Sequence, residues 1–317
     1  MSIFDKRVNY KPFEYPEVLQ FVDAINKSFW VHSEIDFTAD IQDFKSSLTP
    51  VEKEIVKRSL LSIAQVEVGV KTFWGDLYKH FPKPEINGLG ATFAECEFRH
   101  SEAYSRLLEV LGYNEEFQKL LEIPVFSKKL ELIENSLYSS KDIISKLLFF
   151  TIVIENASLF SQFANILSFT RFKGYLKNTS NIIAWTSIDE QTHANAGIYL
   201  LNKLEEEGFV TQEIKEQMAK NVLEYIQYES ELLDWIYEAG ELSFFSKTDM
   251  LNFMKYRVDL SLEKIGLKKL FNITDEQYKP MLWFDEDVFA NELDDFFAKR
   301  PTAYTKHDKS ITADDLF

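Results

Sequence analysis

With 317 residues, the chain is long enough for one large domain or two ordinary ones and can bury a substantial core. Its formal net charge of −16, with no block rich in lysine or arginine, argues against nucleic acid or an anionic membrane surface as a partner. Only 10 glycines and 8 prolines occur among many leucines, lysines and glutamates, which favours long helices over a turn-rich β fold.

The first helix with clear signals opens at Thr49 and Pro50, an N-cap residue followed by proline at the first helical position. Apolar residues at helical spacing continue to about residue 80. Pro82 and Pro84 are expected to end this helix.

A second helix is expected over 85–111, with Gly112 as the glycine that follows its last turn. Periodicity predicts further helices over 114–136 (in shorter pieces), 139–170, 180–206, 211–239 and 247–269. After Phe297 the periodicity is lost. The sequence therefore predicts a helical domain over 1–297 and a flexible tail over 298–317.

Several features indicate a cytoplasmic protein. Cys96 is the single cysteine and cannot form an internal disulfide, which fits a reducing compartment, and the N-terminus lacks an apolar core of signal-peptide length. The stretch between Lys146 and Arg171 is apolar, but Glu155 and several Ser, Asn and Gln side chains make it too polar for a lipid-exposed helix. We expect it to be a helix buried inside the protein, with no membrane as partner.

Three predicted helices carry a carboxylate in an otherwise apolar stretch. Glu67 and Glu155 each stand as the only formally charged side chain of their stretch, and Asp189 and Glu190 together are the only charges of a third. An ionised carboxylate buried without a partner costs several kcal/mol or more. Three such helices therefore predict a shared cation.

Two Glu-x-x-His pairs, Glu97 with His100 and Glu190 with His193, add nitrogen ligands. Residues i and i+3 lie on one helical face, so each pair can present an oxygen and a nitrogen to one ion. Together with two isolated glutamates on other helices, this pattern resembles ferritin-like dinuclear carboxylate proteins. Such ligands suit iron or manganese better than zinc. Cys96, next to Glu97, is expected to point away from the ligands and to serve as a small packing residue.

Longer motifs resemble the small subunit of class I ribonucleotide reductases over nearly the whole chain. The motifs that carry the resemblance are Glu97-x-x-His100-x-x-x-Tyr104, Asp189-Glu190-x-x-His193, Phe29-Trp30 followed by Glu34-Ile35-Asp36, and the late segment MLWFDEDVFANELDDFFAKRPTAYTKH. In that family the tyrosine one turn beyond the first histidine can hold a radical.

The resemblance implies an all-α, ferritin-like bundle with a dinuclear metal site, which generates and stores the oxidising equivalent that starts ribonucleotide reduction in a large subunit. The implied metal ligands are Glu67, Glu97, His100, Glu155, Glu190 and His193. The family implies a transfer path through Trp30, Asp189 and His100, with Tyr304 as relay tyrosine. It further implies a homodimer and a tail that docks on the large subunit through Leu316 and Phe317.

Two departures leave the metal and the role of Tyr104 open: Glu67 stands where many members carry aspartate, and Thr186 where an aliphatic residue is common. Lys71 lies four residues after Glu67, on the same helical face. If it lines an access channel, its charge would attract an anion such as superoxide more than dioxygen. This resembles the subclass with two manganese ions that themselves hold the oxidation. We therefore favour two manganese ions, with two irons or a manganese–iron pair as alternatives; a surface lysine is the alternative for Lys71.

Two other functions use similar ligands. One is a ferritin-like oxidase or monooxygenase acting on a small substrate, and the other is a non-enzymatic metal-binding protein. Trp30, Tyr304 and the acidic tail with its apolar end favour the reductase over both.

Overall fold

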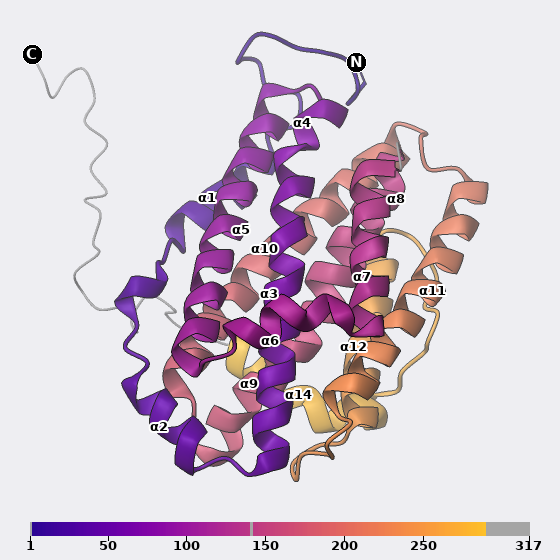
Figure 1. Ribbon diagram of the computed structural model, residues 1–317. Helices are drawn as coiled ribbons and strands as arrows, with labels where there is room; N and C mark the ends of the chain where they lie inside the picture. The colour runs from indigo at the N-terminus through magenta and orange to yellow at the C-terminus, as the bar shows by residue number, and fades with distance from the viewer. Residues whose placement is uncertain (1, 140–141, 290–317) are drawn as a thin grey trace, which may run out of the picture.

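Long helices make up the described part of the chain, which comprises residues 2–139 and 142–289 of a computed structural model. These residues contain no β-strand, and the all-α helical bundle predicted from the sequence is confirmed (Figure 1). The part of the chain after residue 289, which includes Tyr304, Leu316 and Phe317, lies outside the described residues.

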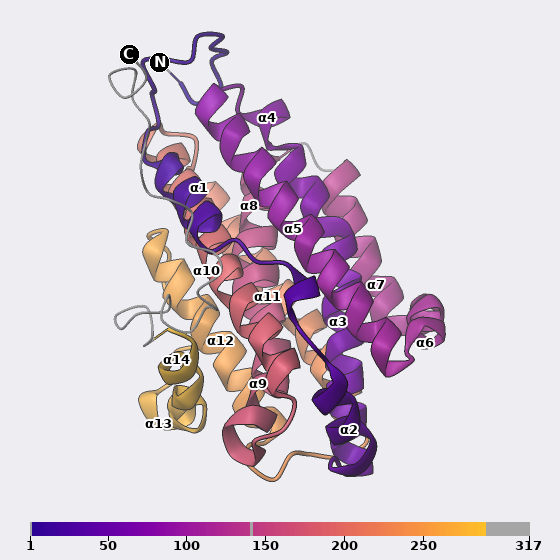
Figure 2. The same cartoon turned by 90° about the vertical axis from the view of Figure 1, so that its left-hand side faces the viewer.

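Four segments form the centre of the bundle and carry the candidate ligands. They are α3 (Pro50–Gly75), α5 (Pro84–Leu111), α10 (Lys177–Glu206) and the π-helix η4 (Leu148–Ser158), which continues into α9 (Leu159–Lys173). α3 packs against α5 (Figures 1 and 2), and η4 packs against α10.

The start of α3 follows its sequence signals closely. Thr49 accepts a hydrogen bond from the Glu52 amide, and Glu52 accepts one from the Thr49 amide, which closes a capping box. The predicted helix over 50–80 is divided in two, since α3 ends before Asp76 and the short α4 (Leu77–His80) follows. Pro84 is the first residue of α5, where its missing N–H has no cost, so it opens this helix rather than ending the previous one.

The helix predicted over 139–170 differs from the structure at its start and in its middle. It begins with α8 (Ile143–Leu147), because the Asp142 side chain caps it by accepting from the Ile144 amide at 3.0 Å. It then widens into η4, whose residues are all buried. π-Helices are rare and are frequently found at functional sites.

The remaining elements surround this centre. They are α1 (Val18–Lys27), α2 (Thr38–Ser46), α6 (Asn114–Lys119), α7 (Pro124–Glu134), α11 (Gln212–Ile236), α12 (Lys247–Lys264), α13 (Asp275–Tyr278), α14 (Leu282–Val288), the π-helix η3 (Asn135–Ser139), and the 3₁₀ turns η1 (His32–Glu34), η2 (Leu120–Glu122) and η5 (Lys279–Met281). α12 stops before the predicted residue 269, because Gly266 turns the chain with a φ of 70°.

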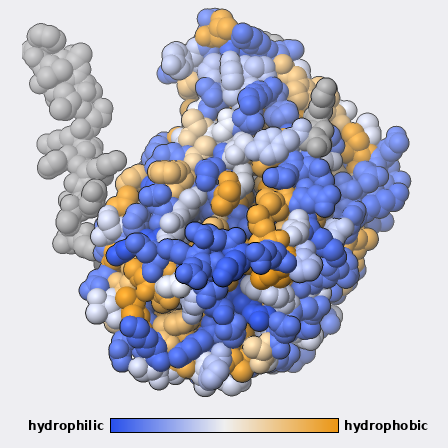
Figure 3. All heavy atoms as spheres, in the orientation of Figure 1, coloured by the Kyte–Doolittle hydropathy of each residue, from blue (hydrophilic) through white to orange (hydrophobic). Residues whose placement is uncertain are grey.

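The stretch that is apolar enough to cross a membrane runs over Ile143–Lys173, and 94% of its most apolar window is buried inside the bundle. This agrees with the buried helix expected from its polar side chains. The surface in Figure 3 mixes hydrophilic and apolar groups; on α3 and α5, Val68 and Phe98 are the large apolar side chains that stay more than half exposed.

Two glycines allow the ligand helices to approach closely. A Cβ added to Gly197 on α10 would lie 2.1 Å from the Thr151 side chain of η4, and one added to Gly90 on α5 would lie 2.5 Å from the Trp74 carbonyl of α3. Since neither position tolerates a methyl group without a backbone shift, these glycines set the spacing of both helix pairs.

Candidate metal centre

Six side chains from four segments meet in the middle of the bundle, and each of them is at most 1% exposed. They are Glu67 from α3, Glu97 and His100 from α5, Glu155 from η4, and Glu190 and His193 from α10. These are the six residues that the sequence singled out.

One set of four ligand atoms lies around His100. Its Nδ1 is 3.1 Å from Glu190 Oε1, 3.3 Å from Glu97 Oε2 and 3.9 Å from Glu67 Oε1. Ligand atoms of these four residues all lie within 4.8 Å of one another, which is close enough to surround a single metal ion.

A second set of four lies around His193. Its Nδ1 is 2.8 Å from Glu97 Oε1, 3.4 Å from Glu190 Oε2 and 4.0 Å from Glu155 Oε1. Both sets contain Glu97 and Glu190. Two overlapping sets, built from a Glu on each of two helices and two Glu-x-x-His pairs, suit a dinuclear site.

Most of the ligand oxygens and nitrogens lack hydrogen-bond partners within the described part of the protein, which fits a metal site. Among the described residues, buried carboxylate oxygens without a hydrogen-bond partner belong to the four glutamates alone, and Nδ1 of both histidines is unpaired as well. Burial, and after it the nearby Glu97 carboxylate, raises the pKa of Glu67 well above its usual range. Carboxylates this close cannot all stay ionised unless a cation lies among them.

Asp189 orients His100 from the side away from the metal set. Its Oδ2 lies 3.2 Å from His100 Nε2 and accepts from the Trp30 indole at 2.9 Å, while Ser28 donates to Oδ1 at 3.1 Å. Burial alone would raise the pKa of Asp189, but the hydrogen bond from His100 and the charge of Arg99 bring it below its usual range. The Asp189 carboxylate therefore accepts a hydrogen bond from the Nε2–H group of His100. The lone pair on Nδ1 of His100 is then free to bind a metal.

The expectation that Cys96 points away from this region is wrong. Its Sγ lies 3.5 Å from His100 Nε2 and 3.5 Å from Asp189 Oδ2. The reason is helical spacing, since Cys96 and His100 are four residues apart and share a face of α5. The thiol contacts the groups behind the histidine rather than the carboxylate set.

Trp74 belongs to the site, although no sequence pattern marked it. Its indole N–H donates to Glu155 Oε1 at 2.6 Å, and its ring packs edge-on against Phe93, whose centroid lies 4.1 Å from that of His193. Trp74 follows Glu67 by seven residues on α3, so helical periodicity places it on the ligand face but does not name its partner.

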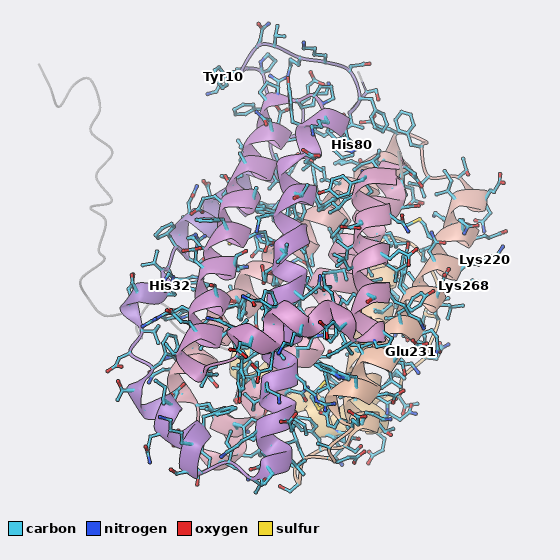
Figure 4. The ribbon with its side chains drawn as sticks, viewed as in Figure 1. Tyr10, His32, His80, Lys220, Glu231 and Lys268 are labelled. Carbon is cyan, nitrogen blue, oxygen red and sulfur yellow. The ribbon has the colours of Figure 1, made fainter. Side chains whose placement is uncertain are left out.

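Tyr104 is 1% exposed, and its hydroxyl has no hydrogen-bond partner. Burial, and after it the charge of Glu67, raises the pKa of this phenol well above its usual range. Lys71 is half-buried at the edge of the site, with Nζ 3.3 Å from the Glu67 carbonyl oxygen and 3.4 Å from Ser101 Oγ. Two further histidines, His32 and His80, lie at the periphery of the bundle (Figure 4).

The sequence model of the family described as "Ribonucleotide reductase, small chain" matches residues 7–280. This chain belongs to the ribonucleotide reductase small-chain family. As a small subunit of this oxidoreductase it has a dinuclear metal site, and membership implies a large-subunit partner and dimer formation.

Curated relatives share this family over most of their length. "Probable ribonucleoside-diphosphate reductase small subunit 048L" of Invertebrate iridescent virus 3 is 26% identical over 336 aligned residues, which cover 99% of this chain and 88% of the relative. "Ribonucleoside-diphosphate reductase subunit beta" of Chlamydia pneumoniae is 26% identical over 300 residues, covering 87% and 83%.

Solved structures of small subunits share the fold. The R2 subunit from Clostridium botulinum superposes with a TM-score of 0.79 at 19% identity, covering 88% of this chain and 90% of that one. The structure titled dimanganese(II)-NrdF of Streptococcus sanguinis gives a TM-score of 0.74 at 19% identity, covering 88% and 99%.

Proposed function

We propose that this small subunit holds two metal ions on six side chains and uses them to generate and store the oxidising equivalent for ribonucleotide reduction. The proposed ligands are Glu67, Glu97, His100, Glu155, Glu190 and His193. The observation that carries this proposal is the cluster of buried carboxylate oxygens and imidazole nitrogens that have no partner in the protein. Two bound ions would supply one-electron oxidising power that no side chain of the site has by itself.

We propose that the oxidising equivalent leaves the metal site along a path of three residues, Trp30, Asp189 and His100. The Trp30 ring stacks near His100, with 5.7 Å between centroids, and its indole N–H donates to Asp189. When an electron leaves Trp30, the indole becomes acidic and Asp189 Oδ2 is in place to take its proton. Trp30→Phe should therefore retain metal and fold but lose nucleotide reduction with the large subunit.

Two manganese ions are the proposed metals. Carboxylate and imidazole ligands do not separate manganese from iron, so the proposal depends on Lys71, whose ammonium at the edge of the site would attract superoxide. Elemental analysis after expression in manganese-rich medium, with paramagnetic resonance before and after superoxide, tests the assignment. Activity that arises only in iron-loaded protein would overturn it, and a manganese–iron pair would show as equal amounts of both metals.

The oxidation is proposed to stay on the metals, so Tyr104 is dispensable. Its buried hydroxyl forms no hydrogen bond to a carboxylate or imidazole that could receive its proton among the described residues, which supports this assignment. Tyr104→Phe should keep nucleotide reduction and leave the resonance signal of the activated protein unchanged. Loss of activity together with a missing tyrosyl signal in the variant would assign the radical to Tyr104 instead.

We propose that the tail over 298–317 docks on the large subunit, with Tyr304 as relay and Leu316 and Phe317 as apolar anchors. All three residues lie outside the described residues, so the support is their place in the sequence. Truncation after residue 307 should preserve metal loading and abolish nucleotide reduction with the large subunit. Full reduction by the truncated protein would refute docking through the tail.

A homodimer in the cytoplasm is the proposed state of this subunit. Val68 and Phe98, 56% and 54% exposed on α3 and α5, supply apolar surface for a second copy. Phe98→Glu should shift the protein to a monomer in sedimentation velocity while its helical signal is unchanged.

A further inference from the structure

One guanidinium group lies between the two segments that carry Glu155 and Glu190. Arg257, on α12, donates from Nε to the Asn156 carbonyl at 2.7 Å and from Nη2 to Asn156 Oδ1 at 2.9 Å. The same Nη2 donates to Gln191 Oε1 at 2.7 Å. Asn156 follows Glu155 on η4, and Gln191 follows Glu190 on α10. Arg257 therefore bonds to the chain neighbour of a proposed ligand on each of two helices.

Asn156 is also held from its other side. Its Nδ2 donates to the Arg257 carbonyl at 3.1 Å and to Ser261 Oγ at 2.7 Å. α12 thus binds Asn156 through both its backbone and its amide side chain. Since η4 is a π-helix, with a wider turn than an α-helix, this contact holds an unusual backbone shape at the residue next to Glu155.

The position of Arg257 is costly for a charged group, which argues for a specific role. The side chain is 7% exposed, and burial lowers its pKa to about 10, so it remains a cation at neutral pH. Its nearest carboxylate, Asp285, is 3.8 Å away and partly exposed, whereas its short hydrogen bonds go to neutral oxygens. Arginine suits this place because its planar fork reaches Asn156 and Gln191 together, which a lysine ammonium cannot do with the same geometry.

The other side of the guanidinium faces the last described helix. Its Cζ lies 3.6 Å from the Phe160 ring centroid and 5.7 Å from that of Phe289, the residue that follows α14. Phe160 also stacks with Phe289, and Asp285 belongs to α14. α14 therefore contacts the same side chain that holds the two ligand segments, and it directly precedes the part of the chain assigned to docking.

We propose that Arg257 is a positioning residue that holds Glu155 and Glu190 in register for the metal and links metal binding to the order of α14. This rests on the ligand assignment made above. Both glutamates belong to the set around His193, so a shift between η4 and α10 separates two ligands of one ion. Because coupling is reciprocal, a metal that fixes these helices also fixes Arg257 and, through it, α14.

Arg257→Lys and Gln191→Met test the positioning role in the full-length protein. Arg257→Lys keeps the positive charge and loses the planar guanidinium that reaches Asn156 and Gln191 together. Gln191→Met keeps the size of the side chain and loses the amide oxygen that accepts from Arg257. We expect each to weaken Mn²⁺ binding at one of the two sites by about 10-fold or more, the range known for outer partners of metal ligands. Arg58→Lys is the matched control, because Arg58 also lies over an aromatic ring, Trp235, and donates to a backbone carbonyl far from the metal set.

Two measurements distinguish a positioning role of Arg257 from a purely structural one. They are the Mn²⁺ affinity, measured by competition with a chelator, and the melting temperature of the metal-free protein. If Arg257 is purely structural, Arg257→Lys should lower the melting temperature, as is also expected for Arg58→Lys, and leave Mn²⁺ affinity within about twofold of the wild type. That result would overturn the proposal. If Arg257→Lys fails to fold, the same affinity criterion applies to Gln191→Met. A wild-type protein that binds neither Mn²⁺ nor Fe²⁺ would instead refute the proposed metal site itself.

Hydrogen exchange of the wild type tests the link to α14. Mn²⁺ should slow amide exchange in α14, and Arg257→Lys should remove most of this effect, whereas Arg58→Lys should retain it. Exchange in the wild-type α14 that does not respond to Mn²⁺ would disprove the link.

Discussion

Two buried polar clusters lie against the π-helix η4, and they differ in how their polar atoms are paired. In the first, the carboxylates around Glu155 leave most of their oxygens without a hydrogen-bond partner. In the second, Lys129 Nζ donates to Ser158 Oγ at 2.9 Å and lies 3.1 Å from Glu229 Oε1, while Ser158 donates to Glu229 Oε2 at 2.6 Å. Lys129 and Glu229 are each 5% exposed, so both clusters place charges in the interior.

The difference teaches that burial of charge does not by itself mark a functional site. The cluster of Lys129 has one cation for one carboxylate and is complete within the protein. The metal cluster has four carboxylates and two imidazoles, and the cation that would balance them must come from outside. Whether the buried polar atoms have partners within the protein, rather than whether they are buried, distinguishes a structural ion pair from a set of metal ligands.

The largest expected effect is loss of metal from the first cluster. Glu190→Gln should remove both ions, because Glu190 belongs to both ligand sets, whereas Glu67→Gln should remove one. Metal content by elemental analysis checks this, and the melting temperature of the metal-free protein should not fall in either variant, since each removes one of several crowded carboxylates. Equal metal loss in the two variants would contradict the overlap of the sets.

The second cluster should respond in the opposite way. Glu229→Ala leaves the Lys129 ammonium buried without its counter-charge and should lower the free energy of unfolding by about 3–5 kcal/mol, with Mn²⁺ affinity per folded protein retained. Denaturant unfolding of the metal-free protein measures it. The double variant Lys129→Met with Glu229→Leu is the control and should recover most of the stability, because no unpaired charge remains. A loss of metal as large as in Glu190→Gln would make the clusters one functional unit.

Added metal should stabilise the protein only through the first cluster. At free Mn²⁺ of about 100 times its Kd, one site raises the free energy of unfolding by about 2.7 kcal/mol. Lys129→Met with Glu229→Leu should show the same increase, and Glu190→Gln should show none. Calorimetry with and without Mn²⁺ gives the comparison, and an increase that persists in Glu190→Gln would place the stabilising ion elsewhere.

The smallest effect on stability is expected at Lys71, a lysine that lies beside the metal cluster but makes no ion pair with it in the described structure. Lys71→Ala should change the free energy of unfolding by no more than about 0.5 kcal/mol and leave metal content unchanged. Activation of the manganese protein by superoxide should slow by up to about tenfold, because the attracting charge is gone. Lys71→Arg should keep the rate. Equal activation rates in wild type and Lys71→Ala would remove Lys71 from the access path.

The sequence by itself determined the helices and the six candidate ligands. Helical periodicity and caps depend on residues within one or two turns, so the Thr49 cap, the Gly112 stop and both Glu-x-x-His pairs were readable along the chain. Isolation of Glu67 and Glu155 among apolar residues pointed to burial, which the structure confirms.

Only the tertiary structure decided which residues hold those ligands in place. Trp74 meets Glu155 across 81 positions of the chain, and Arg257 meets Asn156 across 101. The Asp189 partner of the Cys96 thiol likewise lies on another helix, although the face of α5 that carries Cys96 follows from helical spacing. The widened turn of η4 was not expected from the sequence either. The physical reason is that helical spacing defines a face but not the partner that packs on it, and partners far apart in the chain are chosen by how whole helices fit together.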